Sequence, residues 1–200
     1  MTISTDGHMG SGKTKVHFFS LGSGTDISPE AYDQPVLYIG AAGEGVFSIG
    51  EQSMEPGAGE CVFVPAGILC GIKAADRTGF IYTEILMDKE TNMNNILKSA
   101  EVFKLKDLID YEKGSIANMD LASGQGMKFM ILSFDDGCAL SEHRAPGNAL
   151  LFALEGKAVI GYEGKQYQIQ AGENFRFDKN GLHSVTAVGR FKMALLLIIE

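Results

Sequence analysis

The chain has 200 residues, which is enough for one large domain or for two of about 100 residues each. Its hydrophobic share of 45% and charged share of 21% are typical of a globular chain with a core, so they exclude a disordered protein. The net charge of −8 excludes nucleic acid as an expected partner, because a phosphate backbone attracts positively charged surfaces.

The 25 glycines, against 5 prolines, predict many tight turns and therefore an all-β fold of short antiparallel strands. The first residues contain no apolar run of signal-peptide length. Met193–Ile199 is the most hydrophobic stretch, and it is too short to span a bilayer. We therefore expect a cytoplasmic protein without a membrane partner.

Residues 1–14 are expected to form a flexible, glycine-rich leader. Within it, Gly7–Thr14 fits the phosphate-binding pattern GxxxxGK[ST]. That chemistry needs a buried strand before the loop and a helix after it, whereas Val16–Phe19 is apolar and β-prone. The segment is therefore predicted to bind no nucleotide.

The rest of the chain reads as two β domains, 15–88 and 102–200, separated by a polar linker over 89–101. One or two helical turns are expected in the linker, over Ile96–Ala100. In chain order, the expected strands are Pro35–Ile39, Val46–Ile49, Cys61–Val64, Val102–Tyr111, Ser115–Leu121, Ala149–Leu154, Ala158–Tyr162 and Asn174–Phe177.

The two domains repeat each other at an offset of 113 residues, which is the spacing between Gly43 and Gly156 (156 minus 43). At this offset Ala58–Glu60 coincides with Ala171–Glu173 without a gap. Repeated short strands favour a closed or sandwiched antiparallel sheet, because closure protects the strand edges. Both halves should then have the same fold.

The turns of the two halves resemble the second motif of the cupins, G(X)5PxG(X)2H. Gly59–Cys70 matches this motif except at its last position, where cysteine replaces histidine. Gly172–His183 keeps the histidine and lacks the proline and the second glycine. The resemblance implies two tandem cupin barrels (double-stranded β-helix, or jelly roll), joined by a short, partly helical linker.

A closer resemblance covers 102–200. Ser141–Pro146 and Leu154–Gly156 are similar to the first motif of a single-domain cupin group, which reads SEHxAPxDALxxxLEG. Three positions depart from the motif: Asn148 replaces its aspartate, Ala145 the second histidine and Ala149 the glutamate.

The resemblance implies that His143 and His183 project into one end of the second barrel, where cupins usually hold a metal with three imidazoles and a carboxylate. These two histidines could hold one divalent transition metal (Fe, Mn, Ni, Zn or Cu) with an incomplete ligand set. They could instead serve a metal-free polar pocket. Asn148, at the motif position, is a further pocket candidate.

Arg176 and Asp178 lie two residues apart on an expected strand, hence on one face. They are predicted to form a surface or intersubunit ion pair. Alternatively, Arg176 could bind a carboxylate or phosphate at the rim of the pocket.

The first barrel is expected to be a degenerate structural or dimerising half. The repeat sets Glu30 opposite His143 and Cys70 opposite His183. Glutamate and cysteine could ligate zinc, but a packed, apolar Cys70 is expected. His17 lies outside both motifs and is interpreted as a surface or partly buried strand residue.

Because cupin barrels serve many functions, the fold does not select one. We expect a cupin-domain protein that binds a small molecule in its C-terminal barrel, with or without one metal, and that forms a homo-oligomer such as a dimer. The alternatives are a metal-dependent enzyme, such as a dioxygenase or isomerase acting on a small oxygenated substrate, and a non-catalytic structural or dimerising bicupin.

Overall fold

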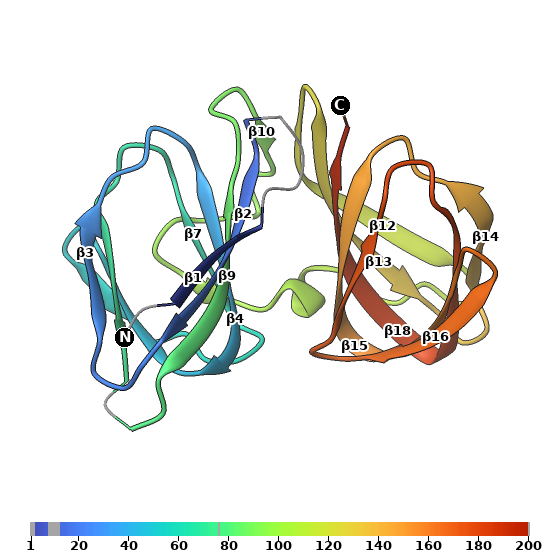
Figure 1. The fold of residues 1–200 in the computed structure, drawn as a ribbon, viewed down its shortest axis with the longest axis horizontal. Coiled ribbons are helices and arrows are strands. Elements are labelled where there is room, and N and C mark those ends of the chain that lie inside the picture. The colour runs from blue at the N-terminus through green and yellow to red at the C-terminus, as the bar shows by residue number, and fades with distance from the viewer. Residues whose placement is uncertain (1–2, 8–12, 76, 200) are drawn as a thin grey trace. The chain divides into compact units, whose positions relative to one another are not determined.

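A computed structural model describes residues 3–7, 13–75 and 77–199 and has an all-β fold. The chain divides into two compact units, one comprising Met1–Thr91 with Asn95–Lys104 and the other Asn92–Asn94 with Leu105–Glu200 (Figure 1). The strands of the first unit are β1 Ile3–Gly7, β2 Lys15–Leu21, β3 Asp26–Glu30, β4 Val36–Gly43, β5 Gly45–Ile49, β6 Gln52–Met54, β7 Cys61–Val64, β8 Cys70–Ala74, β9 Phe80–Leu86 and β11 Val102–Phe103. Those of the second unit are β10 Asn92–Met93, β12 Ile116–Gly124, β13 Met127–Phe134, β14 Ala139–Arg144, β15 Asn148–Tyr162, β16 Lys165–Gln170, β17 Asn174–Phe177 and β18 Leu182–Ile198, with a 3-10 helix η1 at Leu105–Leu108.

In the first unit, two antiparallel sheets enclose the core. Their strand orders are β1-β2-β9-β4-β7-β11 and β3-β8-β5-β6. Alternate residues on each strand face inward, because successive side chains of a strand point to opposite faces. The inward positions of β9 are Phe80, Tyr82, Glu84 and Leu86, of which three are hydrophobic and belong to the buried core.

The second unit has the same plan, but its two longest strands are continuous. The first half of β15 pairs with β17 and its second half with β16, while β18 pairs with β14 and then with β13. Its core is apolar and includes Phe134, Phe177 and Phe191. These strands place His143 and His183 at one end of the barrel.

The registers confirm the predicted repeat. Glu30 lies opposite Cys70 in the first unit, as His143 lies opposite His183 in the second. The pairing also shifts between Gly40 and Ala42 in β4, and at the residues 113 positions later in β15, between Ala153 and Glu155. Since irregularities coincide as well as strands, the two units share one fold in detail.

The junction between the domains differs from the expectation. Turns and an isolated bridge at Ser99 replace the expected helical turns over Ile96–Ala100. Five residues are too few to offset the cost of starting a helix, so the contacts of this segment with the rest of its unit determine its conformation. The expected strand Val102–Tyr111 is also wrong in part, because β11 ends at Phe103 and η1 follows.

The expected linker 89–101 is divided between the units. Its strand β10 pairs with β12 of the second unit, whereas β11, just after it, pairs with β7 of the first. Two-residue strands have no sequence pattern of their own and form only where a partner edge is available.

Residues 8–12 of the phosphate-loop pattern lie outside the described residues. Before them, Ile3–Gly7 of the expected leader forms β1, which pairs with β2. After them, the chain enters β2 at Lys15 rather than a helix. Within the described part of the chain, no helix is long and apolar enough to cross a membrane.

Candidate functional site

His143 and His183 lie side by side at the mouth of the second barrel. They are directly opposite each other on the antiparallel strands β14 and β18, and their ring centroids are 4.3 Å apart. Directly opposed residues point to the same face of a sheet. The structure therefore brings together the two histidines that the motifs singled out.

Backbone hydrogen bonds orient both rings. Nδ1 of His143 lies 2.8 Å from the carbonyl oxygen of Ser141, and Nδ1 of His183 lies 2.9 Å from that of Gly181. Because a carbonyl oxygen only accepts, each Nδ1 carries the proton and donates it. In the neutral rings, each Nε2 therefore keeps a lone pair for an external hydrogen-bond donor or a metal.

The two histidines differ in exposure. His143 is exposed, whereas only 5% of His183 is accessible and its ring stacks on Phe177 at 4.3 Å. Burial lowers the pKa of His183 below its usual 6.5, and the neighbouring His143 lowers it further, although the hydrogen bond to Gly181 acts against both. His183 is thus neutral at pH 7 and able to accept a hydrogen bond.

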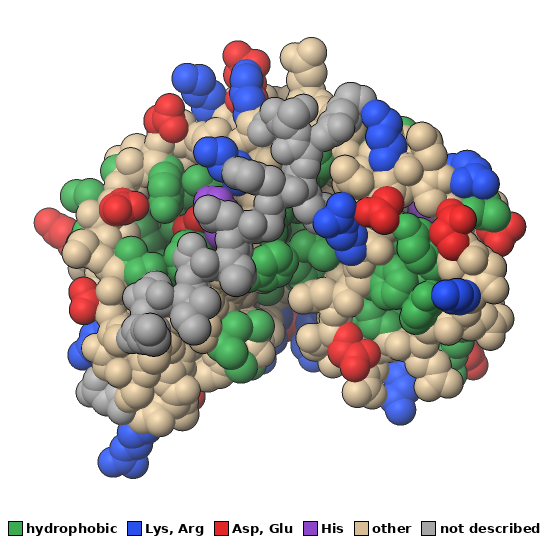
Figure 2. Space-filling model, in the orientation of Figure 1, with side chains coloured by type: hydrophobic (Ala, Val, Ile, Leu, Met, Phe, Trp, Pro, Cys, Tyr) green, Lys and Arg blue, Asp and Glu red, His purple; other side chains and the backbone are tan. Residues whose placement is uncertain are grey.

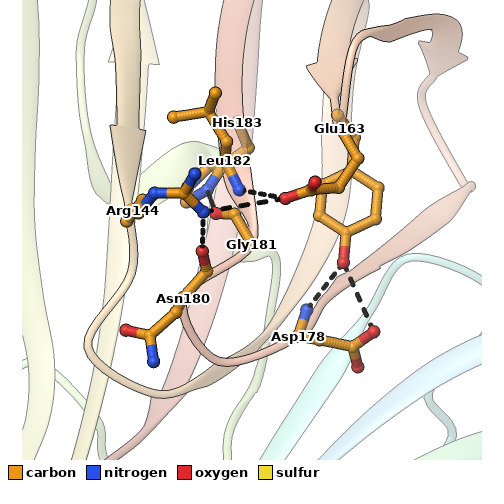
Figure 3. A network of polar contacts seen from close by, with 8 residues as sticks. Arg144, Glu163, Asp178, Asn180, Gly181, Leu182 and His183 are labelled. Atoms are coloured by element: carbon orange, nitrogen blue, oxygen red, sulfur yellow. Dashed lines mark hydrogen bonds and ion pairs between the residues drawn. The ribbon is translucent and has the colours of Figure 1, made fainter.

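A polar network holds the turn 178–181 beside His183 (Figure 3). A guanidinium nitrogen of Arg144 donates to the carbonyl oxygen of Asn180, and the same nitrogen lies 3.9 Å from the Glu163 carboxylate. Glu163 in turn accepts from the Leu182 amide at 2.6 Å. Tyr162 exchanges hydrogen bonds with Asp178 through its hydroxyl.

The remaining candidates from the sequence belong to this turn or lie next to it. Asn148 accepts a hydrogen bond from the Lys179 amide at 3.0 Å, so its side chain fixes the turn. Arg176 forms an exposed ion pair with Asp178 at 3.0 Å. Arg144 and Arg176 are both engaged with carboxylates.

Two imidazoles fall short of the usual protein ligand set for a transition metal, which has at least three members. Among the described residues, no group of three or more His, Cys, Asp or Glu side chains is placed to hold a metal ion. Glu142, which precedes His143, lies in the irregular stretch of β14 between Leu140 and His143 and is exposed. The donor set does not fit a resident metal.

Below the histidines the barrel is filled by apolar side chains, including Phe177 and Val185. A cavity of about 290 Å³ in this unit is lined by other residues, among them Lys157, Gln168 and Val188. The histidines are not among the residues that line this cavity.

Comparison with known proteins bears on the fold that carries this site. Residues 130–199 match the family described as Cupin domain, and this range includes both histidines. Residues 130–199 form a cupin domain. No curated protein matches the chain significantly.

Solved cupin structures extend the likeness to the rest of the chain. A Cupin 2 conserved barrel domain protein from Leptotrichia buccalis has a TM-score of 0.84 and 24% identity over 99% of this chain and 89% of its own. A cupin superfamily protein from Desulfitobacterium hafniense has a TM-score of 0.52 and 26% identity over 55% of this chain and 99% of its own. Salicylate 1,2-dioxygenase from Pseudoaminobacter salicylatoxidans has a TM-score of 0.67 and 9% identity over 92% of this chain and 68% of its own. The cupin family match is thus limited to residues 130–199, while the likeness of fold to solved cupin structures extends along the chain.

The motifs gave no indication of Tyr162, Glu163 and Phe177, which support the histidine mouth. Tyr162 lies opposite His183 in the register of β15 and β18. The pairing could have been predicted by aligning the strands of the two halves as well as their glycine turns.

Proposed function

We propose that this cupin binds a small, neutral, hydroxylated molecule at the mouth of its C-terminal barrel, through the Nε2 atoms of His143 and His183. The observation that carries the proposal is the convergence of two imidazoles whose Nδ1 atoms are both tied to backbone carbonyls. Two neighbouring acceptors suit a ligand with two neighbouring donors, such as a vicinal diol. The net charge of −8 and the carboxylate-paired arginines disfavour an anionic ligand.

The proposal needs no metal, because the described donor set lacks a third protein ligand. Its enzymatic alternative, a metal-dependent dioxygenase or isomerase, requires a more complete ligand set than these residues supply. The likeness to salicylate 1,2-dioxygenase at 9% identity supports the shared fold and does not favour that alternative.

The test is a titration with catechol, a flat vicinal diol, in the presence of EDTA and without oxygen, followed by the ring signals of ¹⁵N-labelled histidine. We expect saturable shifts of the Nε2 signals of both residues. His143→Ala and His183→Ala should each abolish the binding, and Cys70→Ala, in the other barrel, should leave it unchanged.

The matched control ligand is 1,2-dimethoxybenzene, which has the same ring and oxygens but no donor. Equal binding of the two compounds would refute the role of the Nε2 acceptors. Stoichiometric metal in the purified protein that is lost in both histidine variants would favour the enzymatic alternative instead.

A further inference from the structure

The interior of the first barrel contains a buried carboxylate. Glu84, on β9, is 2% accessible and lies among the inward residues of the core. Nδ1 of His17, directly opposite on β2, lies 2.8 Å from its Oε1. Burial raises the pKa of Glu84, while hydrogen bonds from His17 and Tyr38 oppose that shift. A buried carboxylate is costly even when it is paired, so its position calls for an explanation.

The second barrel shows that the fold does not require this group. In the first unit Tyr38 and His17 both lie opposite Glu84, and in the second unit the corresponding Leu151 and Met130 both lie opposite Leu195. By the same register, Met193 replaces Tyr82. The second barrel thus builds the same interior positions from apolar side chains alone.

Tyr82 adds an independent observation. Its side chain is 1% accessible, and its hydroxyl has no hydrogen-bond partner among the described residues. Burial raises the pKa of this hydroxyl, and the nearby Glu84, Tyr32 and Cys70 raise it further, so it remains a protonated donor. A buried donor without a partner is uncommon in proteins and calls for an explanation.

The titratable groups around Glu84 and Tyr82 extend toward the surface. His17 and Tyr32 are half-buried, and Glu30 is exposed. The others, Tyr38 and Cys70, are buried, and burial raises the pKa of the Cys70 thiol to about 12. With two carboxylates in this group, an anion would be repelled, and His17 already partners the Glu84 charge. The group therefore favours a neutral ligand.

We infer that the interior of the first barrel is a second binding site, where Tyr82 and Glu84 hold a small neutral hydroxycarbonyl compound. The Tyr82 hydroxyl donates to the carbonyl oxygen of the ligand, and the Glu84 carboxylate accepts from its hydroxyl group. The site is separate from the histidine mouth and uses none of the motif positions for its two principal contacts.

Hydroxyacetone is the probe, because it has one carbonyl and one hydroxyl group on three carbons. Titration of the whole protein, carrying ¹³C-labelled tyrosine rings, should shift the Tyr82 signals saturably. Acetone lacks the hydroxyl group and 1,2-propanediol lacks the carbonyl, so each should bind at least tenfold more weakly. Tyr82→Phe identifies the Tyr82 signal by its loss and should abolish binding. Glu84→Gln should weaken the binding of hydroxyacetone at least tenfold.

A stability measurement separates binding from structure. Tyr82→Phe removes a hydroxyl without a described partner, so it should keep or raise the melting temperature. The control Tyr167→Phe, at an exposed position, and His183→Ala, in the other barrel, should leave hydroxyacetone binding unchanged. The inference is overturned if the Tyr82 signals do not respond saturably, if Glu84→Gln binds normally, or if Tyr82→Phe lowers the melting temperature.

Discussion

Gly43 and Gly156 occupy the same place in the two barrels, and both have a backbone conformation that residues with a side chain rarely adopt. Their φ angles are +73° and +76°. A Cβ on Gly43 would lie 2.1 Å from the carbonyl oxygen of Gly79, and one on Gly156 would lie 2.0 Å from that of Arg190. At both positions, the left-handed backbone and the closeness of the neighbouring strand therefore both favour glycine.

We predict that Gly156→Ala destabilises the second unit by more than the ~1–2 kcal/mol that a positive φ alone costs an alanine. The control is Gly172→Ala, at φ +88° with open space around the new Cβ, which should cost about 1–2 kcal/mol. Urea unfolding of both variants measures the difference. Equal losses would show that the approach of Arg190 contributes nothing.

Single residues also show where sequence reasoning succeeded and where it failed. His143 and His183 were found because each has a position in a motif, and motif positions converge in the fold. Glu84 was missed because it lies on a flanking strand outside the motifs. His17, also outside them, is the partly buried strand residue that the sequence predicted, but its contact with Glu84 was not foreseen. The available signal was the alternation of Phe80–Leu86, which puts the polar Glu84 on an otherwise apolar face.

At the scale of elements, the turn 178–181 determines the shape of the histidine mouth. We predict that Asn148→Ala loosens this turn, because the Lys179 amide loses its acceptor. The expected loss of stability is about 1 kcal/mol, the usual net value of one hydrogen bond. Faster hydrogen exchange of the Lys179 amide, with weaker binding of catechol, would report the change.

Asn148→Asp is the matched control, since it keeps an acceptor oxygen at the same place. It should restore slow exchange at Lys179. If Asn148→Ala weakened binding without faster exchange, Asn148 would contact the ligand directly rather than position the turn.

Elements with their own sequence pattern were predictable, and those that depend on partners were not. The expected Cys61–Val64 and Asn174–Phe177 coincide with β7 and β17, since each is an apolar or aromatic run bounded by turns. The strands β10 and β11 have only two residues each. Which sheet each of them joins is determined by tertiary contacts, with β12 and β7 respectively. The pairing of the linker with both units therefore could not be read from composition.

For the whole molecule, the two buried titratable sites act on stability in opposite directions. The pKa of His183 is lowered from 6.5, so the unfolded chain takes up a proton at a higher pH than the folded second unit. Stability from this group is therefore lost as the pH falls below about 6.5.

The pKa of Glu84 is raised from 4.5, so the folded first unit keeps its proton to a higher pH than the unfolded chain. Stability from Glu84 is therefore lost as the pH rises above about 4.5.

We predict that acidification from pH 6.5 toward 4.5 weakens the second unit and strengthens the first. The low pKa values of Asp135 and Glu155 affect the second unit mainly below this window, because their usual values are 3.8 and 4.5. Hydrogen exchange can measure both trends in one sample, since the slowest amides of β18 and β9 report on their own units. His183→Gln should flatten the trend in β18 alone, and Glu84→Gln the trend in β9 alone. If either substitution flattened both trends, the two units would unfold as one cooperative body, and the separate linkage of the two sites to folding would be wrong.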